Sequence, residues 1–218
     1  MIERFEQAEQ VFGEIDAATK EKIPIYTIGG AVLLKRGLKP ATKDIDLVVS
    51  SRQEFLNLQN ALVKIGFSKK IPGKEYTHMN LNQIFQRGEF SIDVFEKEVC
   101  GKFSLSENMM KRAEKVIELK HITVYLCSNE DIFLFKNMTE RDGDITDCYE
   151  IATKGPDWNI ILEELQHQIR QSKQDIWVTW VGERMDILEE RGINIPIMDQ
   201  LNQLREAYME KWMKERER

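Results

Sequence analysis

Three aspartates inside apolar runs are the residues of this sequence best suited to chemistry. Asp44 and Asp46 lie in the run DIDLVV, and Asp93 interrupts the run FSIDVF. Asp is a poor strand former, so three of them in strand-like segments need an explanation. Because side chains alternate along a strand, Asp44 and Asp46 share one face while Ile45 takes the other. Carboxylates so placed suit Mg²⁺, which binds a few carboxylate oxygens together with water and substrate phosphates.

A pair of glycines precedes the first two aspartates. Gly29 and Gly30 follow the apolar run 25–28 and open a helix-like stretch at 31–36. Glycine permits close backbone approach to an anion, and the start of a helix presents free N–H groups to phosphate. Thirteen residues separate Gly30 from Asp44, which is enough for a short helix and a return to a neighbouring strand. We therefore expect a triphosphate held at the glycines to lie beside metals held by the aspartates.

Asp93 would complete a two-metal site from a neighbouring strand. One ion would hold the triphosphate, and the other would lower the pKa of the attacking hydroxyl in an in-line displacement. Asp93 would serve the second ion or take the proton of the nucleophile. The alternative for each aspartate is an acid in solvent at a strand end. Thr42 and Lys43, directly before the first aspartate, would contact phosphate or simply end a loop.

The elements that must position these residues form an α+β fold. Hydrophobic spacing predicts a small mixed β-sheet flanked by helices over residues 1–127, and a helical domain over 128–218. The expected strands are 25–28, 44–49, 81–85, 90–95, 116–119 and 122–126. The expected helices are 2–18, 31–36, 52–65, a first helix of the second half from 128, then 140–153, 157–172, 174–191 and 197–216. A loop is expected over 69–74, which contains a proline and a glycine.

Composition narrows the class of protein. The chain has 218 residues, of which 42% are hydrophobic and 31% charged, as in ordinary globular proteins. No apolar run is long enough to span a membrane. The three cysteines form no CxxC pair, which is typical of reduced thiols. We therefore expect a cytoplasmic protein. Residues 1–127 carry 19 basic and 17 acidic residues, and residues 128–218 carry 12 and 20. If three acids of the first half bind metal, its remaining charge is basic. That charge suits an anionic substrate, but it is too small for a large nucleic-acid-binding surface.

Taken together, the two glycines, the helix-length spacer, the DID motif and the later strand aspartate resemble the DNA polymerase β-like nucleotidyltransferase superfamily. The resemblance covers residues 25–95. It implies transfer of a nucleoside monophosphate from an NTP such as ATP to a hydroxyl, with release of pyrophosphate and two Mg²⁺ or Mn²⁺ ions as cofactors. The string TKDID and the later helices resemble AbiEii-like and other minimal prokaryotic nucleotidyltransferases. Several of those are toxins of toxin–antitoxin systems.

The resemblance continues in the second half. Residues 128–136, SNEDIFLFK, resemble a family helix whose lysine points towards the nucleotide phosphates, which assigns that role to Lys136. Residues 141–147, RDGDITD, resemble a segment whose acids support the site, which adds Arg141, Asp144 and Asp147. From the residues alone, Lys136 is equally a surface lysine whose stem covers apolar neighbours. Asp144 and Asp147 lie one helical turn apart and would orient Lys136 or Arg141, or form a solvated acidic face.

Three functions remain open at this point. The first is an active nucleotidyltransferase acting on RNA such as tRNA, on protein, or on a small molecule such as an antibiotic, with an antitoxin partner if it is a toxin. The second is a non-catalytic nucleotide-binding or regulatory protein of the same fold. The third is an interaction module whose acidic helical half binds a partner. The presence of all three aspartates favours the first.

Overall fold

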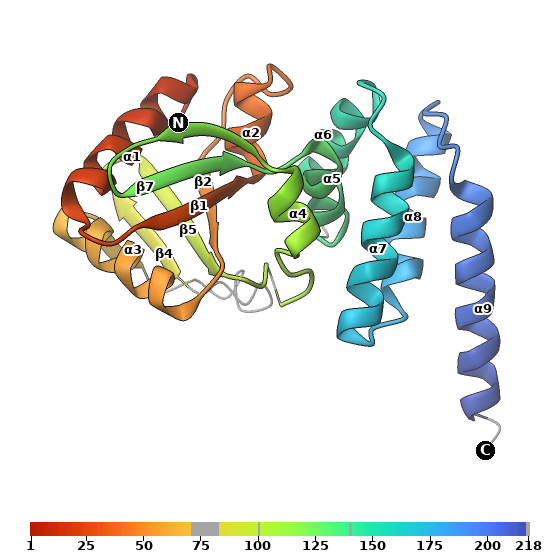
Figure 1. Ribbon diagram of the computed structural model, residues 1–218. Coiled ribbons are helices and arrows are strands. Elements are labelled where there is room, and N and C mark those ends of the chain that lie inside the picture. Colours follow the sequence, from red (N-terminus) through yellow and green to blue (C-terminus); the bar gives the residue numbers. More distant parts are fainter. Residues whose placement is uncertain (71–82, 100, 140, 217–218) are drawn as a thin grey trace. The chain divides into compact units, whose positions relative to one another are not determined.

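The computed structural model describes residues 1–70, 83–99, 101–139 and 141–216. The chain divides into two compact units, Met1–Ser128 and Asn129–Arg218, which are coloured red to green and green to blue in Figure 1. Unit 1 contains the sheet and unit 2 is helical, which confirms the expected α+β fold. Among the described residues, no helix has the length and apolarity to cross a membrane.

The seven strands of unit 1 form one mixed sheet in the order β3-β4-β5-β2-β1-β7-β6. The pairs β2/β5 and β1/β7 are parallel, and the other neighbours are antiparallel. The strands are β1 (Ile23–Ile28), β2 (Asp44–Val49), β3 (Ser68–Lys70), β4 (Gln83–Arg87), β5 (Phe90–Glu96), β6 (Glu114–Glu118) and β7 (Ile122–Leu126). Chain order therefore differs from spatial order, so that β2 lies between β1 and β5 at the centre of the sheet.

Four helices belong to unit 1: α1 (Phe5–Ala18), α2 (Gly29–Lys35), α3 (Arg52–Lys64) and α4 (Glu107–Arg112). Helices α1 and α3 pack against each other and against the strands, on one side of the sheet in Figure 1. Helix α3 starts at a capping box, in which Ser51 Oγ accepts from the Glu54 amide and the Glu54 carboxylate accepts from the Ser51 amide. Asp16 joins α1 to the start of β7, because its Oδ1 accepts from the His121 and Ile122 amides.

Strand β2 shows the alternation that its sequence predicts. Ile45 and Leu47 are fully buried, whereas Asp44 and Asp46 on the opposite face are partly exposed. On β5, Asp93 is likewise partly exposed between the fully buried Ile92 and Val94. The three carboxylates therefore lie on the face opposite Ile45, Leu47, Ile92 and Val94. Further along the strands, Val48 and Phe95 of the carboxylate face are buried as well.

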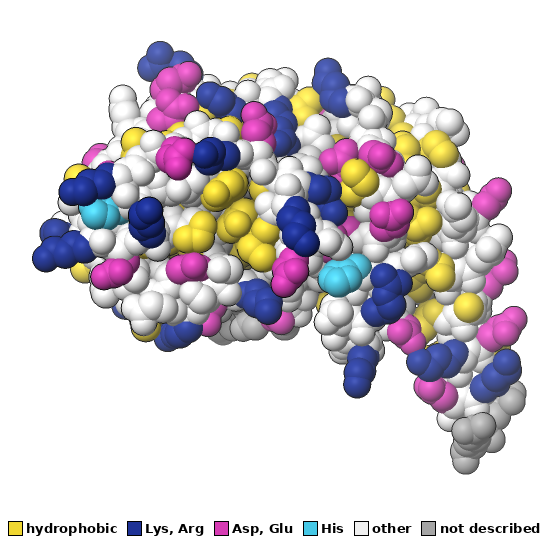
Figure 2. Space-filling model, viewed as in Figure 1, with side chains coloured by type: hydrophobic (Ala, Val, Ile, Leu, Met, Phe, Trp, Pro, Cys, Tyr) yellow, Lys and Arg dark blue, Asp and Glu magenta, His cyan; other side chains and the backbone are white. Residues whose placement is uncertain are grey.

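Unit 2 consists of five helices among its described residues: α5 (Asn129–Asn137), α6 (Asp142–Ala152), α7 (Trp158–Ser172), α8 (Trp177–Glu190) and α9 (Met198–Arg216). Helices α5 to α8 bury most of the apolar side chains of this unit, whereas α9 buries only Met198 and Leu201. Figure 2 shows basic and acidic side chains interspersed on the visible face, with no extended patch of one sign.

Most of the expected elements are present with small shifts at their ends. Strand β3 and helix α4 were not expected, and both are short. Part of the loop expected at 69–74 is strand instead, since β3 ends at Lys70 and pairs antiparallel with β4. The rest of that loop, 71–74, and the first two residues of the strand expected at 81–85 lie outside the described residues.

Candidate active site

The pairing of β2 with β5 brings two of the three aspartates side by side. In this parallel pair Asp46 is the register partner of Asp93, and Asp44 is the partner of Ser91. Register partners on neighbouring strands point to the same face of a sheet. Asp44, two residues before Asp46, shares that face. The structure thus gathers Asp44, Asp46 and Asp93 on one face of two central strands, as the alternation of residue types indicated.

Gly29 lies against the carboxylate of Asp46. The two strands β1 and β2 are antiparallel, with Ile28 opposite Asp46, so the chain leaves β1 directly beside this aspartate. A Cβ on Gly29 would stand 2.1 Å from Asp46 Oδ2, and the residue has a φ of +69°. Both facts make a side chain at this position strained. The glycine therefore lets the backbone at the end of β1 pack directly against the Asp46 carboxylate.

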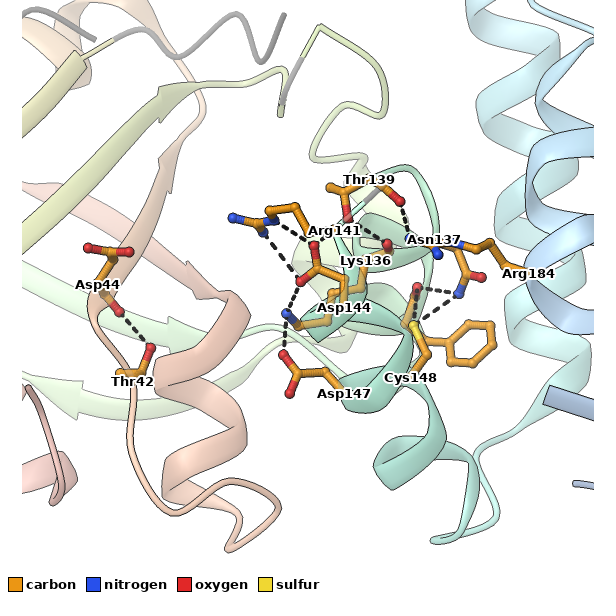
Figure 3. A network of polar contacts seen from close by, with 11 residues as sticks. Thr42, Asp44, Lys136, Asn137, Thr139, Arg141, Asp144, Asp147, Cys148 and Arg184 are labelled. Carbon is orange, nitrogen blue, oxygen red and sulfur yellow. Dashed lines mark hydrogen bonds and ion pairs between the residues drawn. The ribbon is translucent and has the colours of Figure 1, made fainter. Parts of the chain in front are cut away.

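Gly30 has a comparable relationship with Thr42. A Cβ on Gly30 would stand 2.3 Å from Thr42 Oγ1 and 4.0 Å from Lys39 Cδ. The Thr42 hydroxyl donates to the Asp44 carbonyl at 3.1 Å, which fixes the chain just before β2 (Figure 3). Thr42 is buried and Lys43 is exposed. Lys39, which sequence reasoning passed over, is thus the lysine whose stem lies beside the second glycine.

The carboxylate face fits a divalent cation that completes its coordination with substrate and water. Among the described residues, no group of three or more His, Cys, Asp or Glu side chains is gathered closely enough to hold a metal ion by itself. Mg²⁺ does not need such a cage, because it is commonly held by one or two carboxylates together with phosphate oxygens and waters. The Asp46–Asp93 pair, with Asp44 on the same face, could hold an ion in this way.

The residues expected in the second half lie together in unit 2. Lys136 of α5 is 7% exposed, and its Nζ lies 2.8 Å from Asp144 Oδ1 and 2.6 Å from Asp147 Oδ2 of α6 (Figure 3). Both alternatives drawn from the residues alone are therefore wrong. Lys136 is not a surface lysine. Asp144 and Asp147, at 4% and 5% exposed, do not form a solvated acidic face. Arg141 also contacts Asp144, with 2.7 Å between Nε and Oδ2.

The charges of this cluster stabilise one another. Burial alone would lower the pKa of Lys136, but the charges of Asp144 and Asp147 outweigh it and raise that pKa. Burial would likewise raise the pKa of Asp144, but Lys136 and hydrogen bonds from Lys136, Thr139 and Arg141 lower it to about 2. At neutral pH Lys136 and Asp144 are therefore both ionised. Thr139 also belongs to this cluster, as does Arg184, which donates to the Thr139 carbonyl. No pattern in the sequence indicated either residue.

Comparisons with known proteins show the family and a similar fold. A search of curated protein sequences returns no match. Among solved structures, ANT(2″)-Ia in complex with adenylyl-2″-tobramycin matches with a TM-score of 0.50 at 13% identity, covering 76% of this chain and 99% of that chain. At this identity the likeness concerns the fold. A family described as "Nucleotidyltransferase of unknown function (DUF6036)" matches residues 2–180, which include the three aspartates and the Lys136, Arg141, Asp144 and Asp147 side chains. The chain therefore belongs to this family, and it is a nucleotidyltransferase.

Proposed function

We propose that this enzyme transfers a nucleoside monophosphate from an NTP to a hydroxyl acceptor on the carboxylate face of β2 and β5. The observation that carries the proposal is the register pairing of Asp46 with Asp93, beside a glycine whose backbone packs against the Asp46 carboxylate. Two adjacent carboxylates suit a metal-bound triphosphate. Asp44, on the same face, is the third carboxylate of the site.

Divalent metal is the proposed cofactor, as is general for nucleotidyltransferases. When bound, two Mg²⁺ or Mn²⁺ ions would stabilise the attacking and the leaving oxygens of an in-line displacement. Asp44 and Asp46 would hold the ion nearest the triphosphate, and Asp93 would accept the proton of the attacking hydroxyl. The backbone N–H groups of Gly29 and Gly30, at the start of α2, would face the phosphates, and Thr42 would keep Asp44 in place through its hydrogen bond.

For the acceptor we propose a hydroxyl of RNA, including tRNA, or of protein, with the enzyme acting as a toxin held in check by an antitoxin. This rests on the resemblance of TKDID and the later helices to the AbiEii-like enzymes. A small-molecule hydroxyl is the second candidate. It is favoured by the likeness in fold to ANT(2″)-Ia, whose structure contains adenylyl-2″-tobramycin.

The test is a matrix of donors and acceptors. Each of the four labelled NTPs is incubated with Mg²⁺ and the protein, with total RNA, with a protein extract, or with an aminoglycoside such as tobramycin. Pyrophosphate release and label on the acceptor are both measured. Labelled RNA or protein supports the first acceptor class, and labelled aminoglycoside supports the second.

Asp93→Asn and Asp46→Asn test the site itself, and Glu96→Gln is the matched control. Glu96 lies on the same strand as Asp93 but on its other face, where it forms a partly exposed ion pair with Arg52 at 3.0 Å. Such pairs contribute little, so Glu96→Gln should transfer like the wild type. The two Asp variants should bind nucleotide weakly and release no pyrophosphate. Wild-type pyrophosphate release by Asp93→Asn would refute the site, and nucleotide binding without release by the wild type would refute the activity.

A further inference from the structure

The carboxylate face of the sheet continues beyond β5 onto β4 and β3. Register partners share a face. Gln86 of β4 is the partner of Ser91 on β5, which is itself the partner of Asp44. Ser68 of the edge strand β3 is in turn the partner of Gln86. Ser91, Gln86 and Ser68 therefore form a polar row that runs from Asp44 to the edge of the sheet.

The polar row is partly exposed and carries no charge. Ser91 and Gln86 are partly exposed, and Ser68 is exposed. Within the row, Ser68 Oγ donates to the Gln86 carbonyl at 3.1 Å, and Gln86 Nε2 donates to the Gly88 carbonyl at 3.4 Å. A hydroxyl and a primary amide both donate and accept hydrogen bonds. The row therefore suits a neutral ligand that does the same.

The row lies next to Asp93, the proposed base of the reaction. Ser91 precedes Asp93 by two residues on β5 and so shares its face. On β4 the register partner of Asp93 is Ile84, which is buried and apolar, and Gln86 occupies the diagonal position. Diagonal neighbours in a sheet are about 7–8 Å apart, within reach of long side chains. A ligand group held at Asp93 is thus about the width of a sugar ring from Gln86.

The in-line geometry of the proposed reaction selects the side from which the acceptor arrives. The attacking and the leaving oxygens lie on opposite sides of the phosphorus. In the proposed site the pyrophosphate leaves on the β1 side, where Gly29 packs against Asp46. The attacking hydroxyl then arrives on the β5 side, next to Asp93. The strands that follow on this side are β4 and β3 (Figure 1), so the rest of the acceptor lies over the polar row.

We propose that Gln86 and Ser91 bind the acceptor, and that the acceptor is a sugar ring with neighbouring hydroxyls. The Gln86 amide can bond two adjacent hydroxyls, one as donor and one as acceptor. A serine or tyrosine side chain offers a single hydroxyl and leaves part of the row unpaired, and sites built for hydrogen bonds reject ligands that lack them. The sugar is either the terminal ribose of an RNA or part of a small molecule. This inference rests on the proposed function and deepens it, since it narrows the acceptor.

The experiment measures transfer from each labelled NTP, with Mg²⁺, to three acceptors: an oligoribonucleotide with a free 3′ ribose, tobramycin, and a peptide that contains serine and tyrosine. The wild type should label the oligoribonucleotide or tobramycin, and the labelled one identifies the source of the sugar. Gln86→Ala and Ser91→Ala should each raise the KM for that acceptor by about 10-fold, as expected for loss of one or two neutral hydrogen bonds. The KM for the NTP should stay at the wild-type value.

Gln83→Ala is the matched control. Gln83 is a partly exposed glutamine of the same strand, but it is the partner of Val94 and therefore lies on the other face. Its Nε2 donates to the Lys70 carbonyl at 3.4 Å, a bond as long as that from Gln86 to Gly88. Gln83→Ala should keep the wild-type KM for both substrates. An equal rise in the acceptor KM would mean that the effect comes from the strand and not from its face, and would overturn the inference.

Further outcomes separate this inference from the proposed function. A wild-type acceptor KM in Gln86→Ala or in Ser91→Ala would overturn the assignment of that residue. A rise in the KM for the NTP would assign the polar row to the nucleotide and overturn the inference. Label on the peptide, or pyrophosphate release with neither sugar labelled, would overturn the choice of a sugar and leave the proposed function intact. A wild type that releases no pyrophosphate from any NTP would refute the proposed function, and the inference with it.

Discussion

Asp46 and Asp93 are register partners on parallel strands, so two carboxylates lie side by side on one face of the sheet. Like charges directly opposite each other on a sheet destabilise it. A divalent cation between them reverses the sign of that interaction. In the proposed site, bound metal would therefore make this pair a metal-dependent element of stability.

The first prediction concerns this pair. Without divalent ions, Asp93→Asn should melt at the same temperature as the wild type or higher, because one of two like charges is removed. Addition of Mg²⁺ should raise the melting temperature of the wild type, since a ligand that binds only the folded state stabilises it. The variant should show a much smaller rise. Differential scanning calorimetry with and without Mg²⁺ measures this, with Glu96→Gln as the control that should follow the wild type.

The second prediction concerns Gly29, next to the same carboxylate. Gly29→Ala places a Cβ 2.1 Å from Asp46 Oδ2 on a backbone with φ +69°. We expect a loss of roughly 1–3 kcal/mol of stability from the backbone conformation and a fall of about 100-fold in transfer, because the carboxylate must move. Urea unfolding and a pyrophosphate assay measure the two effects.

Gly13→Ala is the matched glycine control. Gly13 lies in α1, and a Cβ added there would meet no atom within 4 Å and would sit on a backbone without a positive φ. In a helix this change should stabilise by about 1 kcal/mol and leave transfer unchanged. If Gly29→Ala and Gly13→Ala gave the same activity, the close approach of Gly29 to Asp46 would have no role in the reaction.

The central strands and the helical second half follow from the sequence because their signals are local. Alternation in DIDLVV predicts β2 over the residues that it occupies, and helical spacing predicts α7 to within a residue. The partnership of Asp46 with Asp93 is different, since strand order and register depend on contacts between distant segments. The sequence places the two aspartates on strands. The expectation that these strands are neighbours came from the chemistry of a two-metal site, and the register of Asp46 with Asp93 is seen only in the structure.

The second-half cluster shows a further limit of sequence reasoning. A lysine in an apolar helix could bind phosphate, lie at the surface, or form a buried ion pair. Only the packing of α5 against α6 decides, because it brings Asp144 and Asp147 to Lys136. The same packing makes Thr139 and Arg184 part of the cluster. No spacing rule links these two residues to it.

The third prediction concerns a hydroxyl in the core. Thr27, in the central strand β1, is fully buried, and its Oγ1 has no hydrogen-bond partner among the described residues. A buried hydroxyl without a partner costs stability, and valine has a similar shape and a high strand propensity. Thr27→Val should therefore stabilise the protein by about 1 kcal/mol in urea unfolding.

Thr42→Val is the matched threonine control for stability. The Thr42 hydroxyl donates to the Asp44 carbonyl at 3.1 Å, so its removal should destabilise by about 1 kcal/mol. The two Thr→Val changes are thus expected to have opposite signs. A loss of stability in Thr27→Val comparable with that in Thr42→Val would show that the Thr27 hydroxyl is satisfied in solution.

The fourth prediction concerns acid. The pKa of Asp144 is lowered from 3.8 to about 2, so the unfolded chain binds its proton at a higher pH than the folded chain does. The stability that this difference contributes is fully present above about pH 4 and is lost as the pH falls towards 2. A shift of this size corresponds to about 2 kcal/mol.

Urea unfolding between pH 5 and pH 2 should show this loss in the wild type. Asp144→Asn, which is less stable at neutral pH, should lose less over the same range because its amide does not titrate. Equal acid sensitivity in the two proteins would mean that Asp144 is not held ionised by Lys136, Thr139 and Arg141.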